Sequence, residues 1–234
     1  MQRIPTDICY LCGRNLADEP WDDDHVPPKQ IYPEVLRSTR DSPMRTLPTH
    51  KSCNNGYSRD EVYFTLSLVP LAPGSQVARL LIDERGTKCL AGKQKGLFPR
   101  VLQEFEARPS GILLPHGLML KRFDGERVYR VIWKIIRGLH FLTFRRAIPG
   151  DTPTGYYQLY EGGRMPSAVD LQLLASCQGL GPHPDIFDYK FLSDDESPRN
   201  LFWALRFWGQ IIVTFAYQCE DPFTPTRENL EHAA

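Results

Sequence analysis

Four side chains near the start of the chain occur in two pairs with the same spacing. Cys9 and Cys12 are separated by two residues and followed by Gly13, and His50 and Cys53 repeat the spacing. Two thiolates from one tight turn can share a zinc ion, and the second pair completes a tetrahedral Cys3His donor set. The spacing therefore predicts a structural Zn²⁺ site at these four residues. The alternative is that the cysteines are ordinary buried or redox-active thiols and that His50 is a surface histidine.

The other three cysteines, Cys89, Cys177 and Cys219, are isolated in the sequence. Six cysteines in 234 residues do not make the dense disulfide framework of a small secreted domain, so a reducing compartment fits better. No run approaches the roughly 18 apolar residues of a membrane helix, and the N-terminus lacks the apolar stretch of a signal peptide. We therefore expect a cytoplasmic protein with no membrane partner.

Polar residues lie between the two pairs and directly after the second. The first group is Asp22-Asp23-Asp24-His25, followed by Val26-Pro27-Pro28, and the second is Asn54-Asn55-Gly56. Together with the two pairs, this order resembles the HNH endonuclease family, the zinc-containing branch of the ββα-metal nucleases. The matching features span about residues 7–64: Cys-x2-Cys, Asp-His followed by Val-x-Pro, Leu47 before the second pair, and Cys-Asn leading into a helix.

The resemblance implies roles for three residues. His25 would be the general base that takes a proton from the attacking water. Asp24 and Asn54 would bind a catalytic Mg²⁺ or Mn²⁺, ions that prefer oxygen ligands such as carboxylates and amides. The implied activity is endonucleolytic hydrolysis of phosphodiester bonds, with double-stranded DNA as the expected substrate. Asp22 and Asp23 are rival metal ligands or part of a solvated acidic turn.

One position departs from the family pattern. The family's middle Asn, which orients the catalytic His, should fall near Arg45 or Thr46, and neither residue is Asn. A non-catalytic zinc module that binds nucleic acid or protein is therefore an alternative function. A third possibility is a redox-responsive regulator that uses Cys9 and Cys12.

Charge is balanced over the whole chain but not along it. Residues 79–146 carry 15 basic and six acidic side chains, a net charge of +9, whereas residues 147–234 have a net charge of −7. The basic segment can neutralise phosphates, or it can be a solvated face that pairs with the acidic C-terminal third. The residues that we expect to contact nucleic acid are Lys29, Arg45, Lys51, Arg127, Arg130, Lys134 and Arg137. His116 and His140 are assigned no role.

The N-terminal segment has little apolar periodicity, so a bound metal would explain how it folds. A helix is expected over residues 58–66, with Asp60 and Glu61 in its first turn, where they favour the helix dipole. The alternative is that Glu61 or Asp60 reaches the catalytic metal through water. Residues 69–75 contain Pro70, Pro73 and Gly74 and are expected to form a linker. The expected domains are an HNH-like domain at residues 1–68 and a domain of unknown role at residues 76–234, for which target recognition is one interpretation.

The second part mixes two periodicities. Apolar residues at helical spacing predict helices at residues 76–83, 96–108 and 126–144, whereas residues 111–123 are more strand-like. Aromatic and β-branched residues predict strands at 188–192, 201–207 and 210–218, with a tight connection at Trp208-Gly209-Gln210. The expected fold class is α+β: a small zinc-stabilised ββα-metal domain, then an α+β domain with a C-terminal antiparallel sheet.

Overall fold

The computed structural model describes residues 2–3, 6–37, 44–91, 96–116, 119–148, 156–160, 166–175, 178–181, 183–193 and 200–218, so Cys177 and Cys219 lie outside the described residues. Helices and strands are mixed in these ranges, and the strands at the C-terminal end form an antiparallel sheet. The expected α+β class is therefore confirmed. No helix in these ranges is both long and apolar enough to cross a membrane.

The N-terminal part is built on a three-stranded sheet with the strand order β1-β3-β2. Its strands are β1 (Gln2–Arg3), β2 (Trp21–Val26) and β3 (Arg45–His50). Its helices are η1 (Leu16–Asp18), η2 (Lys29–Ile31), α1 (Glu34–Arg37), α2 (Lys51–Asn55) and α3 (Ser58–Leu68). The helix expected over residues 58–66 is confirmed as α3, which continues to Leu68. β2 runs antiparallel to β3, with Trp21 opposite His50.

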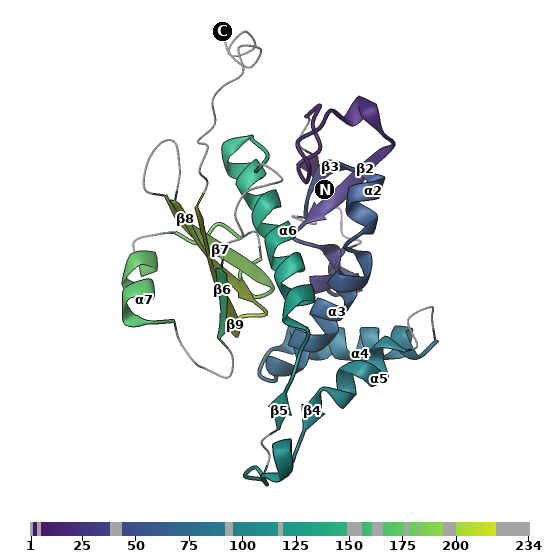
Figure 1. Ribbon diagram of the computed structural model, residues 1–234, viewed down its shortest axis with the longest axis vertical. Helices are drawn as coiled ribbons and strands as arrows, with labels where there is room; N and C mark the ends of the chain where they lie inside the picture. Colours follow the sequence, from purple (N-terminus) through teal and green to yellow (C-terminus); the bar gives the residue numbers. More distant parts are fainter. Residues whose placement is uncertain are drawn as a thin grey trace.

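The middle of the chain is mostly helical and ends in a small hairpin that projects from the bottom of the molecule in Figure 1. Its elements are η3 (Val69–Leu71), α4 (Gln76–Ala91), α5 (Leu97–Gln103), β4 (Phe105–Glu106), η4 (Pro109–Gly111) and β5 (Leu120–Lys121). The helix expected over residues 96–108 ends at Gln103, and β4 then pairs with β5. Residues 111–123 were expected to be strand-like, yet within their described part only Leu120–Lys121 is a strand.

Helix α6 (Gly125–Phe144) is the long helix predicted over residues 126–144. The Asp124 carboxylate accepts a hydrogen bond from the backbone N–H of Arg127, which caps the start of the helix. One side of α6 packs on the C-terminal sheet, where Trp133 stacks on Phe215 with 5.3 Å between ring centroids. Figure 1 shows α6 between that sheet and the N-terminal part.

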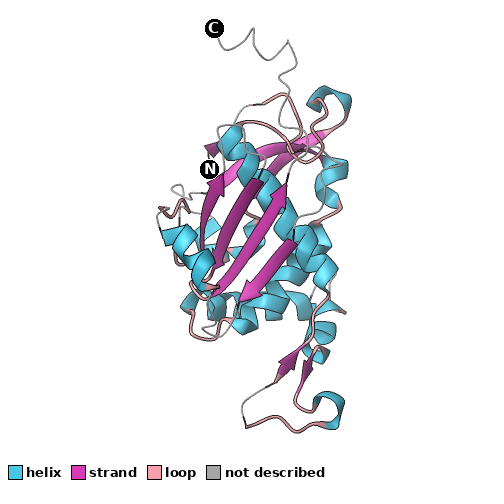
Figure 2. Ribbon diagram, turned by 60° about the vertical axis from the view of Figure 1, so that its left-hand side comes forward, coloured by secondary structure: helices cyan, strands magenta, loops and turns pink. Residues whose placement is uncertain are grey.

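The C-terminal sheet has the strand order β6-β9-β8-β7, and all neighbours are antiparallel. Its strands are β6 (Tyr156–Tyr160), β7 (Phe187–Ser193), β8 (Asn200–Phe207) and β9 (Ile211–Gln218). The three strands predicted from composition are confirmed as β7, β8 and β9. The turn before β9 places Trp208 and Gly209 at positive φ, a conformation that suits glycine. Helix α7 (Ala168–Ala175) lies on the side of this sheet away from α6 (Figures 1 and 2).

One cluster of buried apolar residues joins the parts of the molecule. Phe64 of α3 meets Phe207 of β8 edge-on at 5.4 Å, and the indole N–H of Trp208 donates to the carbonyl of Ile31 at 3.0 Å. These contacts join the N-terminal part to the C-terminal sheet. The division into domains at residues 69–75 stays a prediction.

Candidate functional site

The four residues expected to bind zinc converge in space. One donor atom from each of Cys9, Cys12, His50 and Cys53 lies within 4.8 Å of the others. Donors of a tetrahedral zinc site are about 3.5 to 3.8 Å apart, given the usual Zn–S and Zn–N bond lengths. Cys12 Sγ and His50 Nδ1 are already 3.3 Å apart. The cluster can therefore hold a metal ion such as zinc.

The backbone explains how the first pair forms. The N–H of Gly13 donates to the carbonyl of Cys9 at 2.8 Å, and the N–H of Cys9 donates to the carbonyl of Arg14 at 2.9 Å. Gly13 has a φ of +72°, a left-handed conformation that glycine adopts without strain. This tight turn brings the two thiols of the Cys-x2-Cys pair to the same point.

His50 is oriented as a metal-binding histidine requires. It ends β3 and is fully buried, and its Nε2 lies 2.9 Å from the carbonyl oxygen of Asn15. A carbonyl accepts hydrogen bonds and cannot donate them, so Nε2 carries the proton and Nδ1 turns its lone pair toward the sulfurs. A backbone carbonyl on the second nitrogen is the usual means of holding a metal-bound imidazole.

The thiols differ in their surroundings. Burial raises the pKa of Cys9, but hydrogen bonds from the Thr49 hydroxyl and from backbone N–H groups outweigh it and lower the pKa to about 7. Burial and the nearby charge of Cys9 raise the pKa of Cys53 to about 12. Three neighbouring thiolates repel one another, so a bound cation would stabilise the cluster in its deprotonated form.

A polar cavity of about 240 Å³ lies beside this cluster, between β2, η2, α2 and α3. It collects side chains that the sequence places in two separate segments. Its lining residues are Asp22, Asp23, Asp24, His25, Lys29, Gln30, Asn54, Asn55, Ser58 and Glu61. The three residues to which the resemblance gives catalytic roles, His25, Asp24 and Asn54, are therefore brought together.

His25 is half-buried at the wall of this cavity. Burial and the positive charge of Lys29 lower the pKa of His25, against the opposing effect of Asp24. Its imidazole is therefore neutral at pH 7 and can accept a proton. In the antiparallel pairing of β2 with β3, Thr46 lies directly opposite His25, at the position where the family's Asn was expected. Within the described residues, no hydrogen bond holds the imidazole, so the departure from the family pattern leaves this ring without an orienting partner.

Asp24, Asn54 and Glu61 point their oxygens at the ammonium of Lys134. Lys134 Nζ is 2.8 Å from Asp24 Oδ2 and 2.9 Å from Asn54 Oδ1, and it also contacts Glu61 Oε1. The hydroxyl of Tyr10 donates a second hydrogen bond to Asp24 Oδ2. The position expected for Mg²⁺ or Mn²⁺ between Asp24 and Asn54 thus holds a side-chain cation.

This lysine is deeply buried and charged. Its side chain is 1% exposed, and those of Asp24 and Glu61 are 8% and 7% exposed. Burial disfavours the ammonium form of Lys134, but the attraction of Asp24 and Glu61 outweighs it and raises the pKa. Burial raises the pKa of Glu61, and the charge of Lys134 opposes that effect.

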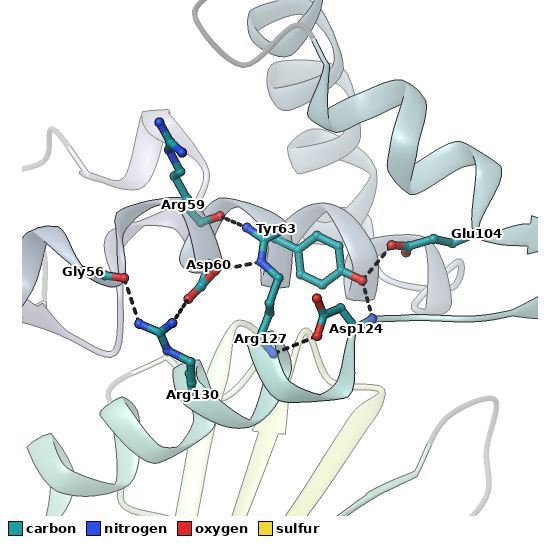
Figure 3. Close-up of polar contacts among 8 residues, drawn as sticks. All are labelled: Gly56, Arg59, Asp60, Tyr63, Glu104, Asp124, Arg127 and Arg130. Carbon is teal, nitrogen blue, oxygen red and sulfur yellow. Dashed lines mark hydrogen bonds and ion pairs between the residues drawn. The ribbon is translucent and has the colours of Figure 1, made fainter.

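Two arginines at the start of α6, Arg127 and Arg130, bind the N-terminal part (Figure 3). The guanidinium of Arg127 bonds Asp60 at 2.7 Å and the carbonyl of Arg59 at 2.9 Å. Arg130 approaches the other oxygen of Asp60 at 3.4 Å and donates to the carbonyl of Gly56 at 3.0 Å.

The other residues expected to contact nucleic acid differ in exposure. Arg137 is buried and donates to the carbonyl of Ile148 at 3.3 Å, and Arg45 is half-buried. Lys29 and Lys51 are exposed, and of these two only Lys29 lines the cavity. Tyr10, Glu61 and Lys134 complete the cluster around Asp24 and Asn54. Tyr10 was given no role from the sequence, Lys134 was expected to contact nucleic acid, and Glu61 was expected at the metal only as an alternative, through water. The only signal was an acidic residue in the first turn of α3.

Comparisons of the chain with models of protein families, with curated proteins and with solved structures find no match. The resemblance to HNH endonucleases rests on the sequence motifs of residues 7–64 alone.

Proposed function

We propose that this protein is an endonuclease of the HNH type that hydrolyses phosphodiester bonds in nucleic acid, with double-stranded DNA as the substrate. One observation carries the proposal. His25, Asp24 and Asn54 come from two separate segments and line one polar cavity beside the Cys/His cluster. That arrangement is the one which the HNH resemblance implies.

His25 is the general base in this proposal. Its neutral imidazole takes a proton from a water molecule whose oxygen forms a bond to phosphorus. The bond between phosphorus and the 3′ oxygen breaks, and the leaving oxygen takes a proton from solvent. The products are a 5′-phosphate and a 3′-hydroxyl.

The Cys/His cluster binds Zn²⁺ in this proposal and has a structural role. The cluster joins the Cys-x2-Cys turn to the end of β3 and the start of α2. It thereby fixes β3 and the start of α2 close to the cavity. A four-ligand site leaves no open position for substrate, which is typical of structural zinc.

Lys29 and Lys51 are the proposed phosphate contacts. Both are exposed and lie next to the site, one at the cavity and one at the first position of α2. The basic residues of α6 that were expected to contact nucleic acid bind groups of this protein, so we assign them no phosphate contact: Arg127, Arg130, Lys134 and Arg137.

A supercoiled plasmid tests the proposed activity. We expect nicking by the wild-type protein and a loss of at least about 100-fold in rate for His25→Ala, as for a lost general base. His116→Ala is the matched control, because His116 is exposed and does not line the cavity. Equal rates for wild type and His25→Ala refute the role of His25.

A non-catalytic zinc module that binds nucleic acid is the second candidate. It is favoured by the lysine in the cation position and by His25, which has no orienting partner among the residues that the structure describes. In that case the wild-type protein binds DNA with a strong salt dependence and cuts none.

A further inference from the structure

We infer that the ammonium of Lys134 permanently holds the position that the HNH resemblance gives to a divalent cation, so that this cluster is organised without a metal. Where catalysis is concerned, the inference rests on the proposed function. Mn²⁺ binding, and not cleavage, tests the inference. The inference can therefore fail while the proposed nuclease function holds, and the nuclease function can fail while the inference holds.

The hydrogen bonds of the lysine are complete. An ammonium has three N–H donors, and those of Lys134 have three acceptors: Asp24 Oδ2, Asn54 Oδ1 and Glu61 Oε1. Asp24 Oδ2 also accepts from Tyr10. The oxygens that would bind Mg²⁺ therefore already bind a cation.

Burial and neighbouring groups also oppose movement of the Lys134 side chain out of this position. Its side chain is 1% exposed, and Nζ lies 5.3 Å from the centroid of the Tyr57 ring, within the range of a cation–π contact. Withdrawal of the ammonium would leave two buried carboxylates that repel each other. The aromatic ring and the two carboxylates therefore stabilise the ammonium of Lys134 in this position.

A divalent cation added to the same oxygens would meet the charge of the lysine. Asp24 and Glu61 together supply two negative charges, and Lys134 already offsets one of them. A metal bound to Asp24 and Asn54 would lie a few ångströms from the ammonium and be repelled by it. Without the lysine, two carboxylates and one amide oxygen would remain, a donor set that suits Mn²⁺.

Lys134 is accordingly a positioning residue. It fixes the carboxylate of Asp24 and the amide of Asn54 at the cavity wall, and its charge also contributes to the lowered pKa of His25. It does not line the cavity, so it acts on the reaction through these neighbours.

Mn²⁺ binding to the zinc-loaded protein, measured from the free-ion electron paramagnetic resonance signal, tests the inference. All proteins carry Asp22→Asn and Asp23→Asn, which remove the exposed carboxylates of the cavity. We expect Mn²⁺ binding to this background to be below detection, and we expect Lys134→Ala to create a site with an affinity at least about tenfold above that limit, because the repelling charge is gone. Adding Glu61→Gln should abolish that site.

Lys121→Ala is the matched control, since Lys121 is also a mostly buried lysine and pairs with a single carboxylate, that of Glu104. We expect it to create no Mn²⁺ site. The inference is overturned if the background protein binds Mn²⁺ as tightly as the Lys134→Ala protein, or if folded Lys134→Ala binds none.

A second measurement covers the case in which Lys134→Ala does not fold. Equimolar Mn²⁺ is added to the background protein, and the side-chain amide signal of Asn54 is followed by nuclear magnetic resonance, with that of exposed Gln103 as reference. An unbroadened Asn54 signal supports the inference. Selective loss of that signal overturns it, because it places Mn²⁺ beside Asn54.

Discussion

Lys134 of α6 and Asp24 of β2 form a buried ion pair with 2.8 Å between Nζ and Oδ2. The pair joins the long helix to the strand that carries His25, so the geometry of the proposed catalytic cavity depends on how α6 packs on the N-terminal part. The same ammonium bonds Asn54 and Glu61, which makes it the centre of the cluster.

Removal of this lysine should destabilise the fold. Lys134→Met leaves the buried carboxylates of Asp24 and Glu61 without their cation, and loss of one partner of a buried pair costs about 3 to 5 kcal/mol. The free energy of unfolding in urea measures the loss. Adding Glu61→Gln to Lys134→Met removes one of the stranded charges and should restore part of the stability. A loss below about 1 kcal/mol for Lys134→Met would contradict a buried pair.

Zinc should bind through Cys53 and not through the isolated Cys89. We expect about one Zn²⁺ per chain in the wild type and an affinity at least about 100-fold lower for Cys53→Ser, with Cys89→Ser as the control. Zinc content after dialysis against a chelator measures the difference. Equal retention of zinc by both variants would show that the metal is not held by this cluster.

Cleavage should increase as pH rises through the acid range. The pKa of His25 is lowered, so its midpoint of deprotonation lies below the usual histidine pKa of about 6.5. The cleavage rate should rise through this midpoint and level off above about pH 6.5. Lys29→Gln removes a charge that lowers the pKa and should move the midpoint to higher pH. The ring-proton shifts of His25 report this midpoint without an activity assay. Lys51→Gln is the control, and an equal shift in both variants would disprove the role of Lys29.

The pair of Arg127 and Asp60 in Figure 3 should contribute to the docking of α6. A double-mutant cycle with Arg127→Met and Asp60→Asn should give a coupling energy of about 1 to 2 kcal/mol, because the ionic hydrogen bond is largely buried. The exposed pair of Arg122 and Glu106 is the control and should give about 0.5 kcal/mol or less. Equal coupling in the two cycles would rule out a special contribution from Arg127.

DNA binding should weaken with salt, and Lys29 and Lys51 should account for part of that dependence. Each change to Gln is expected to reduce the slope of log affinity against log salt by about 1, because one phosphate contact is lost. Arg100→Gln is the control, because Arg100 of α5 is exposed. Unchanged slopes for both lysine variants would move the DNA contact to another surface.

Local features of the sequence determined much of this protein. The spacing of Cys9 with Cys12 and of His50 with Cys53 specifies two local pairs of metal ligands, because each pair forms within a few residues of chain, whereas the fold brings the two pairs together. Helix α6 and the last three strands follow from the spacing of apolar residues, since burial of one face selects the period of the backbone. The strand-like composition of residues 111–123 did not produce a strand of that length, because a strand needs a partner along its length and β4 offers only two residues.

The partners of the basic residues on α6 were decided only by the tertiary structure. A row of Arg and Lys on one side of a helix has the same sequence pattern whether it faces phosphate, water or carboxylates. Here α6 packs against α3, far away in the chain, and that contact brings Lys134 to Asp24, Asn54 and Glu61. Spacing along the chain specifies which residues can share a turn or a helix face. The direction in which that face points depends on the packing of the whole core.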